Sequence, residues 1–232
     1  MQSRHRTPIR VVLVEDDDLF RDLLRHALGT FATIQVLGGF ADAETALEEI
    51  PGLDPDVVVM DIELGGGMNG IQLGLVLRGQ LPGLGVVILS NHADPEFIAS
   101  LPAEVMPGWS YLLKRSVSDA ATIGRAIEGA ARRLIVLDPA LIGAIRPPTT
   151  GPLAHLTRRQ QQILGLLAQG FTNAAIAERL QLAEKSVENQ TNLLYQNLGI
   201  DRAHRSIHPR VQAVLLYIEA SRGQRSLSRP RA

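Results

Sequence analysis

The stretch Val-Val-Leu-Val-Glu-Asp-Asp (residues 11–17) decides the fold, because an uninterrupted apolar run ends abruptly in three acidic residues. Continuous apolar runs are typical of strands buried on both faces of a parallel sheet. The candidate strands cover residues 9–14, 34–37, 57–60, 86–89 and 111–113. Amphipathic helical patterns follow them near residues 18–28, 42–50, 69–79, 95–105 and 117–133. Five such units in about 130 residues predict a doubly wound α/β domain with a five-stranded parallel sheet.

Polar residues stand where these strands end, and the sites of doubly wound domains lie at the carboxyl ends of the strands. The residues are Glu15, Asp16 and Asp17 after the first strand, Asp61 after the third, Ser90 after the fourth and Lys114 after the fifth. Carboxylates that converge there repel one another unless a cation joins them, and hard oxygen ligands suit Mg²⁺. A carboxylate beside a divalent cation can attack a phosphorus centre and form an acyl phosphate.

Acidic residues at strand ends also have a simpler role, which is to cap the following helix. We expect this role for Asp17 or Asp18, which directly precede a helical pattern. Asp61 is different, because four other strand-end positions around it carry the residue types that phosphoryl chemistry needs. A hydroxyl and an ammonium group there would hold the phosphoryl oxygens.

Four segments carry a resemblance to a known family, namely residues 12–21, 57–64, 86–90 and 111–114. In order and spacing they resemble the receiver domain of bacterial two-component response regulators, a flavodoxin-like fold, which would occupy residues 1–133. The resemblance implies that Asp61 accepts a phosphoryl group from a sensor histidine kinase and that Mg²⁺ is the cofactor. The implied magnesium ligands are Glu15, Asp16, Asp61 and the backbone carbonyl of Glu63. The implied switch residues are Ser90 and Tyr111, and Lys114 would pair with the phosphate.

The sequence departs from the family pattern at three places. The loop after Asp61 reads Leu-Gly-Gly-Gly-Met-Asn-Gly (64–70), without the usual proline, and three glycines increase the entropy of a loop. Asn91 replaces the small residue that usually follows the switch hydroxyl. Pro102 and Pro107 interrupt the next helical pattern, so we expect a short or broken fourth helix. The phosphorylation chemistry is therefore expected to be intact, and the surface that transmits the signal to be altered.

The charge of the chain changes sign along its length. Residues 1–150 hold 19 of the 24 acidic residues but 12 of the 23 basic ones, so the remainder is basic. The change falls at Arg-Pro-Pro-Thr-Thr-Gly-Pro (146–152), which has the composition of a linker, and we expect the linker to cover residues 134–152. An acidic domain joined to a basic one indicates that only the second meets a polyanion.

Residues 156–200 show three short helical patterns, the last two joined by a tight turn, which predict a helix-turn-helix or an ordinary small bundle. Thr157 and Thr172 are plausible N-caps of the first two helices. The segments 156–164, 170–180 and 185–190 look like the LuxR-type DNA-binding domain. A receiver followed by such a domain is the architecture of NarL/FixJ-type response regulators.

This resemblance sets the remaining boundaries. The LuxR-type helix-turn-helix domain would occupy residues 153–221, and residues 222–232 would form a basic, disordered tail. A final helix over residues 211–220 is the segment through which such domains often dimerise. An active homodimer is therefore expected.

The outward face of the third helix of this domain is the expected reading surface. Its residues are Lys185, Glu188, Asn189, Asn192 and Gln196, with Arg158 and Arg159 on the first helix as contacts to the DNA backbone. Amides can read adenine, and a carboxylate can accept from the cytosine amino group. Most family members carry a basic residue in place of Glu188, so this face has lost attraction for phosphate. Affinity would then depend on Arg158, Arg159, Arg179, Arg202 and Arg205.

The composition narrows the alternatives further. The chain has no cysteine, which excludes disulfide scaffolds, thiolate metal sites and cysteine nucleophiles and suits the cytoplasm. No apolar run approaches the roughly 18 residues that span a bilayer, so no membrane association is expected.

The leading hypothesis is a phosphorylation-dependent, DNA-binding response regulator that controls transcription and is not an enzyme. Its expected partners are a sensor histidine kinase, double-stranded promoter DNA, RNA polymerase and a second copy of the chain. A regulator controlled by protein partners without phosphate is the first alternative. The second is an acyl-phosphate phosphohydrolase, in which Glu63 would be the acid/base two residues beyond Asp61. That enzyme would want a capping insert, and it leaves the basic half of the chain unexplained.

Overall fold

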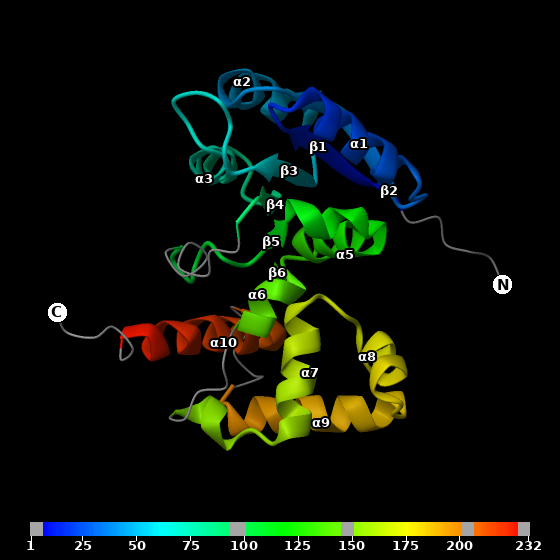
Figure 1. The fold of residues 1–232 in the computed structure, drawn as a ribbon, viewed down its shortest axis with the longest axis vertical. Coiled ribbons are helices and arrows are strands. Elements are labelled where there is room, and N and C mark those ends of the chain that lie inside the picture. The colour runs from blue at the N-terminus through cyan, green and yellow to red at the C-terminus, as the bar shows by residue number, and fades with distance from the viewer. Residues whose placement is uncertain (1–6, 93–100, 145–150, 201–206, 227–232) are drawn as a thin grey trace. The chain divides into compact units, whose positions relative to one another are not determined.

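The computed structural model describes residues 7–92, 101–144, 151–200 and 207–226. These residues form two compact units, one built around a β-sheet and one built from helices. Each unit is described by itself (Figure 1). In the described part of the chain, no helix is both long enough and apolar enough to cross a membrane.

The first unit is organised by a parallel sheet at the predicted positions. Its strands are β1 (Ile9–Val14), β2 (Ile34–Phe40), β3 (Val57–Asp61), β4 (Gly85–Ser90) and β5 (Trp109–Leu113). The order is β2-β1-β3-β4-β5, with a sixth strand of two residues, β6 (Val136–Leu137), after β5. β1, β3, β4 and β5 are almost wholly buried, as their continuous apolar runs predict. The doubly wound fold is therefore confirmed, with one short strand more than the five expected.

Helices cover both faces of this sheet, as the doubly wound arrangement requires. They are α1 (Asp18–Gly29), α2 (Ala43–Leu53), α3 (Gly70–Gln80) and α5 (Ala120–Ala131), with a short 3₁₀ helix, η1 (Lys114–Ser118), after β5. α1 contacts α5 on one face, and α2 contacts α3 on the other. The side chain of Asp17 caps α1 by accepting hydrogen bonds from the backbone N–H groups of Leu19 and Phe20, which confirms its expected capping role.

The predicted fourth helix is not seen in the part of its range that the structure describes. Residues 101–107 form turns and a bend rather than helix, consistent with Pro102 and Pro107. The rest of the predicted range, residues 95–100, lies outside the described residues.

The second unit contains the three predicted helices of residues 156–200, the predicted final helix and two further elements, α6 and η2. In chain order, the elements are α6 (Pro139–Ala144), η2 (Pro152–His155), α7 (Arg158–Ala168), α8 (Asn173–Leu180), α9 (Glu184–Asn197) and α10 (Pro209–Ser226). Thr157 and Thr172 cap α7 and α8, as expected, by accepting bonds from the N–H groups of Gln160 and Ala175. A short turn joins α8 to α9, and Ile163, Ile176 and Val187 from the three helices share one buried cluster.

Regular secondary structure extends into two segments that were expected to be a linker and a tail. The linker expected over residues 134–152 contains β6 and α6, because Asp138 caps α6 by accepting from Ala140 N at 2.8 Å and Leu141 is buried. The tail expected to be disordered from residue 222 is helical as far as Ser226, the end of α10. Residues 227–232 lie outside the described residues.

Candidate phosphorylation site and nucleic-acid interface

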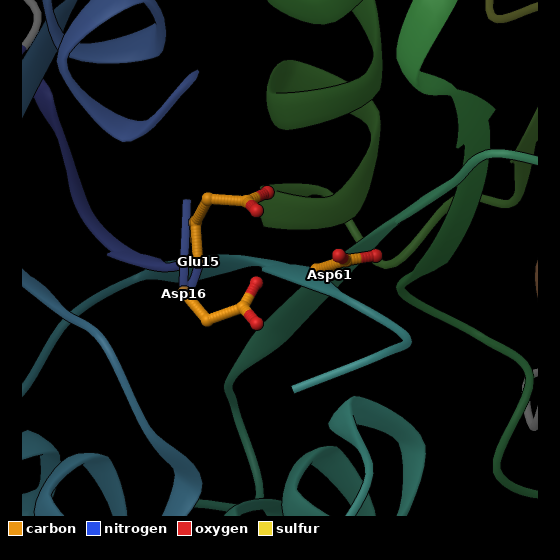
Figure 2. A group of neighbouring side chains, drawn as sticks. All are labelled: Glu15, Asp16 and Asp61. Atoms are coloured by element: carbon orange, nitrogen blue, oxygen red, sulfur yellow. The ribbon is translucent and has the colours of Figure 1, made fainter. Parts of the chain in front are cut away.

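Three carboxylates gather where β1 and β3 end, at the edge that the sequence predicts (Figure 2). Glu15 and Asp16 directly follow β1, and Asp61 is the last residue of β3. One carboxylate oxygen from each lies within 4.8 Å of the others. Glu15 and Asp61 are only 1% and 3% exposed, whereas Asp16 is exposed. The parallel sheet therefore brings together acids that are 46 residues apart in the chain.

Lys114 compensates part of this negative charge. Its Nζ lies 2.8 Å from Glu15 Oε1 and 2.8 Å from Asp61 Oδ2, so one ammonium group bridges the two buried carboxylates. The same Nζ lies 4.7 Å from the centre of the Phe20 ring, in cation–π contact. Burial lowers the pKa of Lys114, but the hydrogen bonds to Asp61 and Glu15 outweigh it and hold the pKa above its usual value. Lys114 is therefore a fixed cation at the site.

The donor set fits a divalent cation. Among the described residues, Glu15 Oε2 and Asp61 Oδ1 are buried atoms that have no hydrogen-bond partner. Burial, followed by repulsion from Asp61, raises the pKa of Glu15 despite its bond to Lys114. Buried carboxylate oxygens without partners are costly unless a cation joins them. Such oxygens, beside the exposed Asp16, make a ligand set that Mg²⁺ prefers.

An open pocket lies beside these carboxylates. Its lining residues are Glu15, Asp16, Asp17, Asp61, Glu63, Leu64, Gly65, Asn91 and Lys114. Glu63 and Asn91 are both exposed at its wall, where the sequence places them relative to Asp61. The pocket therefore brings together the four predicted metal ligands and Lys114.

Ser90 and Tyr111 are not among the residues that line this pocket. Their hydroxyls instead converge on one backbone carbonyl, that of His92, at 2.9 Å from Ser90 Oγ and 2.8 Å from Tyr111 Oη. Ser90 Oγ also accepts from His92 N at 3.1 Å. The two predicted switch residues are thus joined to each other through the chain that leaves β4.

The loop after Asp61 returns to the site through a close backbone contact at Gly70. Gly70 N donates to Ile62 O at 2.9 Å, and a Cβ atom at Gly70 would lie 1.9 Å from Asp61 O. Any other residue there would displace the backbone of the phosphoacceptor candidate. The sequence patterns do not indicate the role of Phe20. An Asn-Gly pair before a helical pattern is a recognisable signal for Gly70.

In the second unit, α7 carries Gln160 at the third position of its capping box, where glutamate is usual in the family that this segment resembles. Gln160 is buried, and its Oε1 accepts from Thr157 N at 3.0 Å while its own N–H donates to Thr157 Oγ1 at 3.2 Å. The same Oε1 accepts from Asn197 Nδ2 at 3.4 Å. The amide therefore completes a capping box and links α7 to the end of α9 without adding charge.

The expected reading residues lie on the outward side of α9. Lys185, Glu188, Asn189 and Gln196 are exposed and Asn192 is partly exposed, while Val187, Thr191 and Leu194 on the opposite side are buried. Lys185 Nζ lies 2.7 Å from Glu188 Oε2, so the one lysine of this face is paired with its one acid. The third helix thus presents amides next to an internally neutralised pair.

The supporting arginines are placed differently from one another. Arg158 and Arg159 are exposed in the first turn of α7, and Arg179 stacks over the Phe171 ring at 4.1 Å. Arg202 and Arg205 lie outside the described residues. Arg210 has a structural role that the sequence did not reveal, because its guanidinium donates to the carbonyls of Leu167 and Phe171 at 2.6 and 2.9 Å. It thereby closes the end of α7.

Comparisons with known proteins agree with this arrangement. Residues 11–121 match the model of the response regulator receiver domain, and residues 154–214 match that of the bacterial regulatory proteins of the luxR family. The chain is 31% identical over 222 residues to the DNA-binding transcriptional activator DevR/DosR of Mycobacterium tuberculosis, covering 93% of this chain and 97% of that protein. It is 34% identical over 198 residues to the transcriptional regulatory protein MctR of Rhizobium johnstonii, covering 84% and 89% of the two chains.

The fold and the site together define a receiver domain joined to a LuxR-type helix-turn-helix domain. The chain belongs to the NarL/FixJ-type response regulators, a family of transcription regulators. Among solved structures it is similar to the response regulator RcsB of Salmonella typhimurium, with a TM-score of 0.54 and 18% identity over 91% of this chain and 99% of that one. At that identity the similarity supports the fold alone.

Proposed function

We propose that this protein is a phosphorylation-dependent transcription regulator in which Asp61 is the phosphoacceptor. One observation carries the proposal: Asp61 lines an open pocket, one of its oxygens is held by Lys114, and the other is buried without a partner among the described residues. A carboxylate that lines an open pocket and is held in place by a lysine is suited to nucleophilic attack. Glu15 and Asp16, which are distant from Asp61 in the sequence but close in space, supply negative charge that would hold a cation beside Asp61.

The proposed reaction is the transfer of a phosphoryl group from the phosphohistidine of a sensor kinase. A carboxylate oxygen of Asp61 attacks the phosphorus, an O–P bond forms, and the N–P bond breaks with its electron pair returning to the imidazole. Glu15, Asp16, Asp61 and the backbone carbonyl of Glu63 would hold Mg²⁺, which neutralises charge on the phosphoryl oxygens when bound. Lys114, already 2.8 Å from Asp61, would pair with the new dianion.

The hydroxyls of Ser90 and Tyr111 supply a route for the signal. Both donate to the His92 carbonyl, so a phosphoryl group on Asp61 that attracts the Ser90 hydroxyl would leave Tyr111 as the donor to that carbonyl. The receiver would respond at His92, two residues after the end of β4. Such a switch biases two local arrangements of the chain, which is what a phosphorylation signal requires.

The second domain would bind double-stranded promoter DNA through α9. The exposed amides of Asn189 and Gln196 match adenine, and Arg158 and Arg159 would contact phosphates. DevR/DosR is described as a DNA-binding transcriptional activator, and one solved structure of RcsB shows two dimers bound to two parallel DNAs. Because Lys185, the lysine of the reading face, is paired with Glu188, we propose that a dimer of this chain engages two half-sites. RNA polymerase would be a further partner, in the cytoplasm.

The test is phosphorylation by acetyl phosphate with Mg²⁺, measured by intact mass. The wild-type chain should gain one phosphate and Asp61→Asn none. Asp138→Asn is the matched control, because Asp138 is equally buried and also follows a strand of the sheet, yet is not among the pocket-lining residues; it should still gain one phosphate. Phosphate on Asp61→Asn would reject the assignment. A wild-type chain that never gains phosphate would instead support a regulator controlled by protein partners.

A further inference from the structure

One large apolar side chain lies exposed on the helix that carries the reading residues. Leu193 exposes 47% of its surface, whereas its neighbour Leu194 is fully buried. The other exposed large apolar side chains of the described residues lie on α1 and α3, namely Leu19, Leu23, Leu75 and Val76. A single exposed leucine has no meaning by itself, so the argument depends on where Leu193 stands.

Leu193 lies beside the row of amides. It is four residues after Asn189 and three before Gln196, and residues at these spacings are neighbours on a helix surface. With about 100° of rotation per residue, Leu193 lies about 40° around the helix axis from Asn189. Glu188 is about 140° away, at the opposite edge of the face. The outward face of α9 therefore has Glu188 at one edge and Leu193 at the other, with Lys185 and the amides between them.

Neighbouring amide and apolar side chains have a counterpart in the major groove. An adenine presents hydrogen-bonding groups that an amide can match, and a thymine presents an apolar C5-methyl group in the same groove. An amide and a leucine side by side can therefore recognise the adenine and the thymine methyl of neighbouring positions together. Glu188, at the far edge of the face, presents a charged carboxylate rather than an apolar group.

We propose that Leu193 is a specificity-determining residue that contacts the C5-methyl group of a thymine in the half-site. The proposal rests on the DNA-binding function proposed above and identifies one base group that the protein would recognise. Leu193 contributes apolar contact, and Asn189 or Gln196 contributes hydrogen bonds at the adjoining position. The exposed side chain of Leu193 would therefore be covered by the wall of the major groove.

The experiment removes one methyl group from the DNA. Preferred sequences are first selected from a random duplex library with the full-length chain after treatment with acetyl phosphate and Mg²⁺. Each thymine of the selected duplex is then replaced, one at a time, by deoxyuridine, which lacks the methyl group. At one thymine of each half-site, replacement should weaken wild-type binding about fourfold, as expected for the loss of one buried methyl. Leu193→Ala should bind the thymine duplex more weakly and show no sensitivity to that replacement.

Two further variants make the result specific. Leu193→Met keeps an apolar side chain of similar size and should retain the sensitivity to the methyl group. Leu23→Ala removes an exposed leucine from α1, outside the reading face, and should behave as the wild type.

The outcomes that overturn the proposal are distinct. Equal sensitivity of Leu193→Ala and the wild type, or no sensitive thymine in a selected site, would reject the methyl contact while leaving DNA binding intact. Weaker binding to both duplexes together with a lower dimer fraction in sedimentation would show that Leu193 contacts a second copy of the chain, which also rejects it. A chain that selects no sequence would reject the DNA-binding function itself, and the inference with it.

Discussion

The two lysines of the chain, one in each unit, form ion pairs of nearly the same length in opposite surroundings. Lys114 lies 2.8 Å from both Glu15 and Asp61, and its side chain is 15% exposed. Lys185 lies 2.7 Å from Glu188, with side-chain exposures of 76% and 48%. Distance alone would rank the two pairs as equals. Their burial makes them different in kind.

A buried ion pair is expensive to break, because removing one partner leaves a charge away from water. An exposed pair of the same length contributes about 0–1 kcal/mol and opens easily. The cation of the receiver site is therefore fixed in place before any phosphate arrives. Lys185, in contrast, is proposed to exchange Glu188 for a phosphate of DNA. The first arrangement suits chemistry at a defined point, and the second suits a surface that must adapt to a partner.

The largest expected effect concerns the rigidity of the receiver site. Gly70→Ala should lower the free energy of unfolding by about 3 kcal/mol or more, because the new methyl would lie 1.9 Å from Asp61 O and the backbone must move. Urea unfolding measures the loss.

Gly79→Ala is the matched control for this change, since Gly79 lies on the same helix and has no atom within 4 Å of an added Cβ. It should raise the stability by about 0.5–1 kcal/mol. If Gly70→Ala proved as stable as the wild type, the loop after Asp61 would be pliable and the site would not be preorganised.

The next effect compares the two lysines directly. Lys114→Ala should lower the free energy of unfolding by about 2 kcal/mol at neutral pH without Mg²⁺, because two buried carboxylates lose their shared cation. Lys185→Ala should lower it by less than about 0.5 kcal/mol. Added Mg²⁺ should restore part of the loss for Lys114→Ala only, since the cation takes over the charge of the ammonium group.

The pH dependence of this loss has a defined sign. Glu15 already has a raised pKa in the folded protein, and loss of Lys114 removes a group that lowers it. A carboxyl group with a raised folded-state pKa binds its proton more tightly when folded, so the loss for Lys114→Ala should shrink as the pH falls below neutral. Urea unfolding at several pH values checks this. A loss that is constant with pH, or equal for the two lysine variants, would remove the distinction between the pairs.

The sequence predicts the strands and the gathering of acids well, because both follow from rules that act along the chain. Apolar runs set the sheet, and parallel strands bring Glu15, Asp16 and Asp61 to one edge whatever the loops do. Contacts between distant side chains are different. Neither the bond of Arg210 to the end of α7 nor the stacking of Phe20 on Lys114 has a periodic signal.

Local contacts also explain why helices extend into the segments expected to be a linker and a tail. The Pro- and Gly-rich composition around residues 146–152 indicates a linker, but it does not show that Asp138 caps a helix just before it. The basic tail was expected to begin at residue 222, whereas α10 continues as helix to Ser226. Its basic composition does not indicate this helix.

The smallest of these effects is expected at Glu188, in the exposed ion pair. Glu188→Lys should tighten DNA binding about tenfold at low salt, because it removes a repulsive charge, frees Lys185 from its 2.7 Å pair and adds a cation. The gain should fall as salt rises, and the slope of log affinity against log salt should steepen by about one for each new phosphate contact. Preference among sequences should weaken, since a carboxylate that can accept from cytosine is replaced by a contact to the backbone. Titrations of the phosphorylated chain at two salt concentrations measure both.

A control must show whether the gain comes from the position of the new lysine on the reading face or only from the change in the net charge of the chain. Glu48→Lys makes the same change of charge on the exposed side of α2, in the other unit, and should leave the salt slope close to that of the wild type. If both variants gained affinity equally, attraction between the whole chain and DNA would explain the effect, and the Lys185–Glu188 pair would have no role. If neither gained, Lys185 would not reach a phosphate even when free. A gain confined to Glu188→Lys, lost at high salt and accompanied by weaker selection, is the result that requires the exposed pair to open on DNA while the pair at Lys114 stays closed.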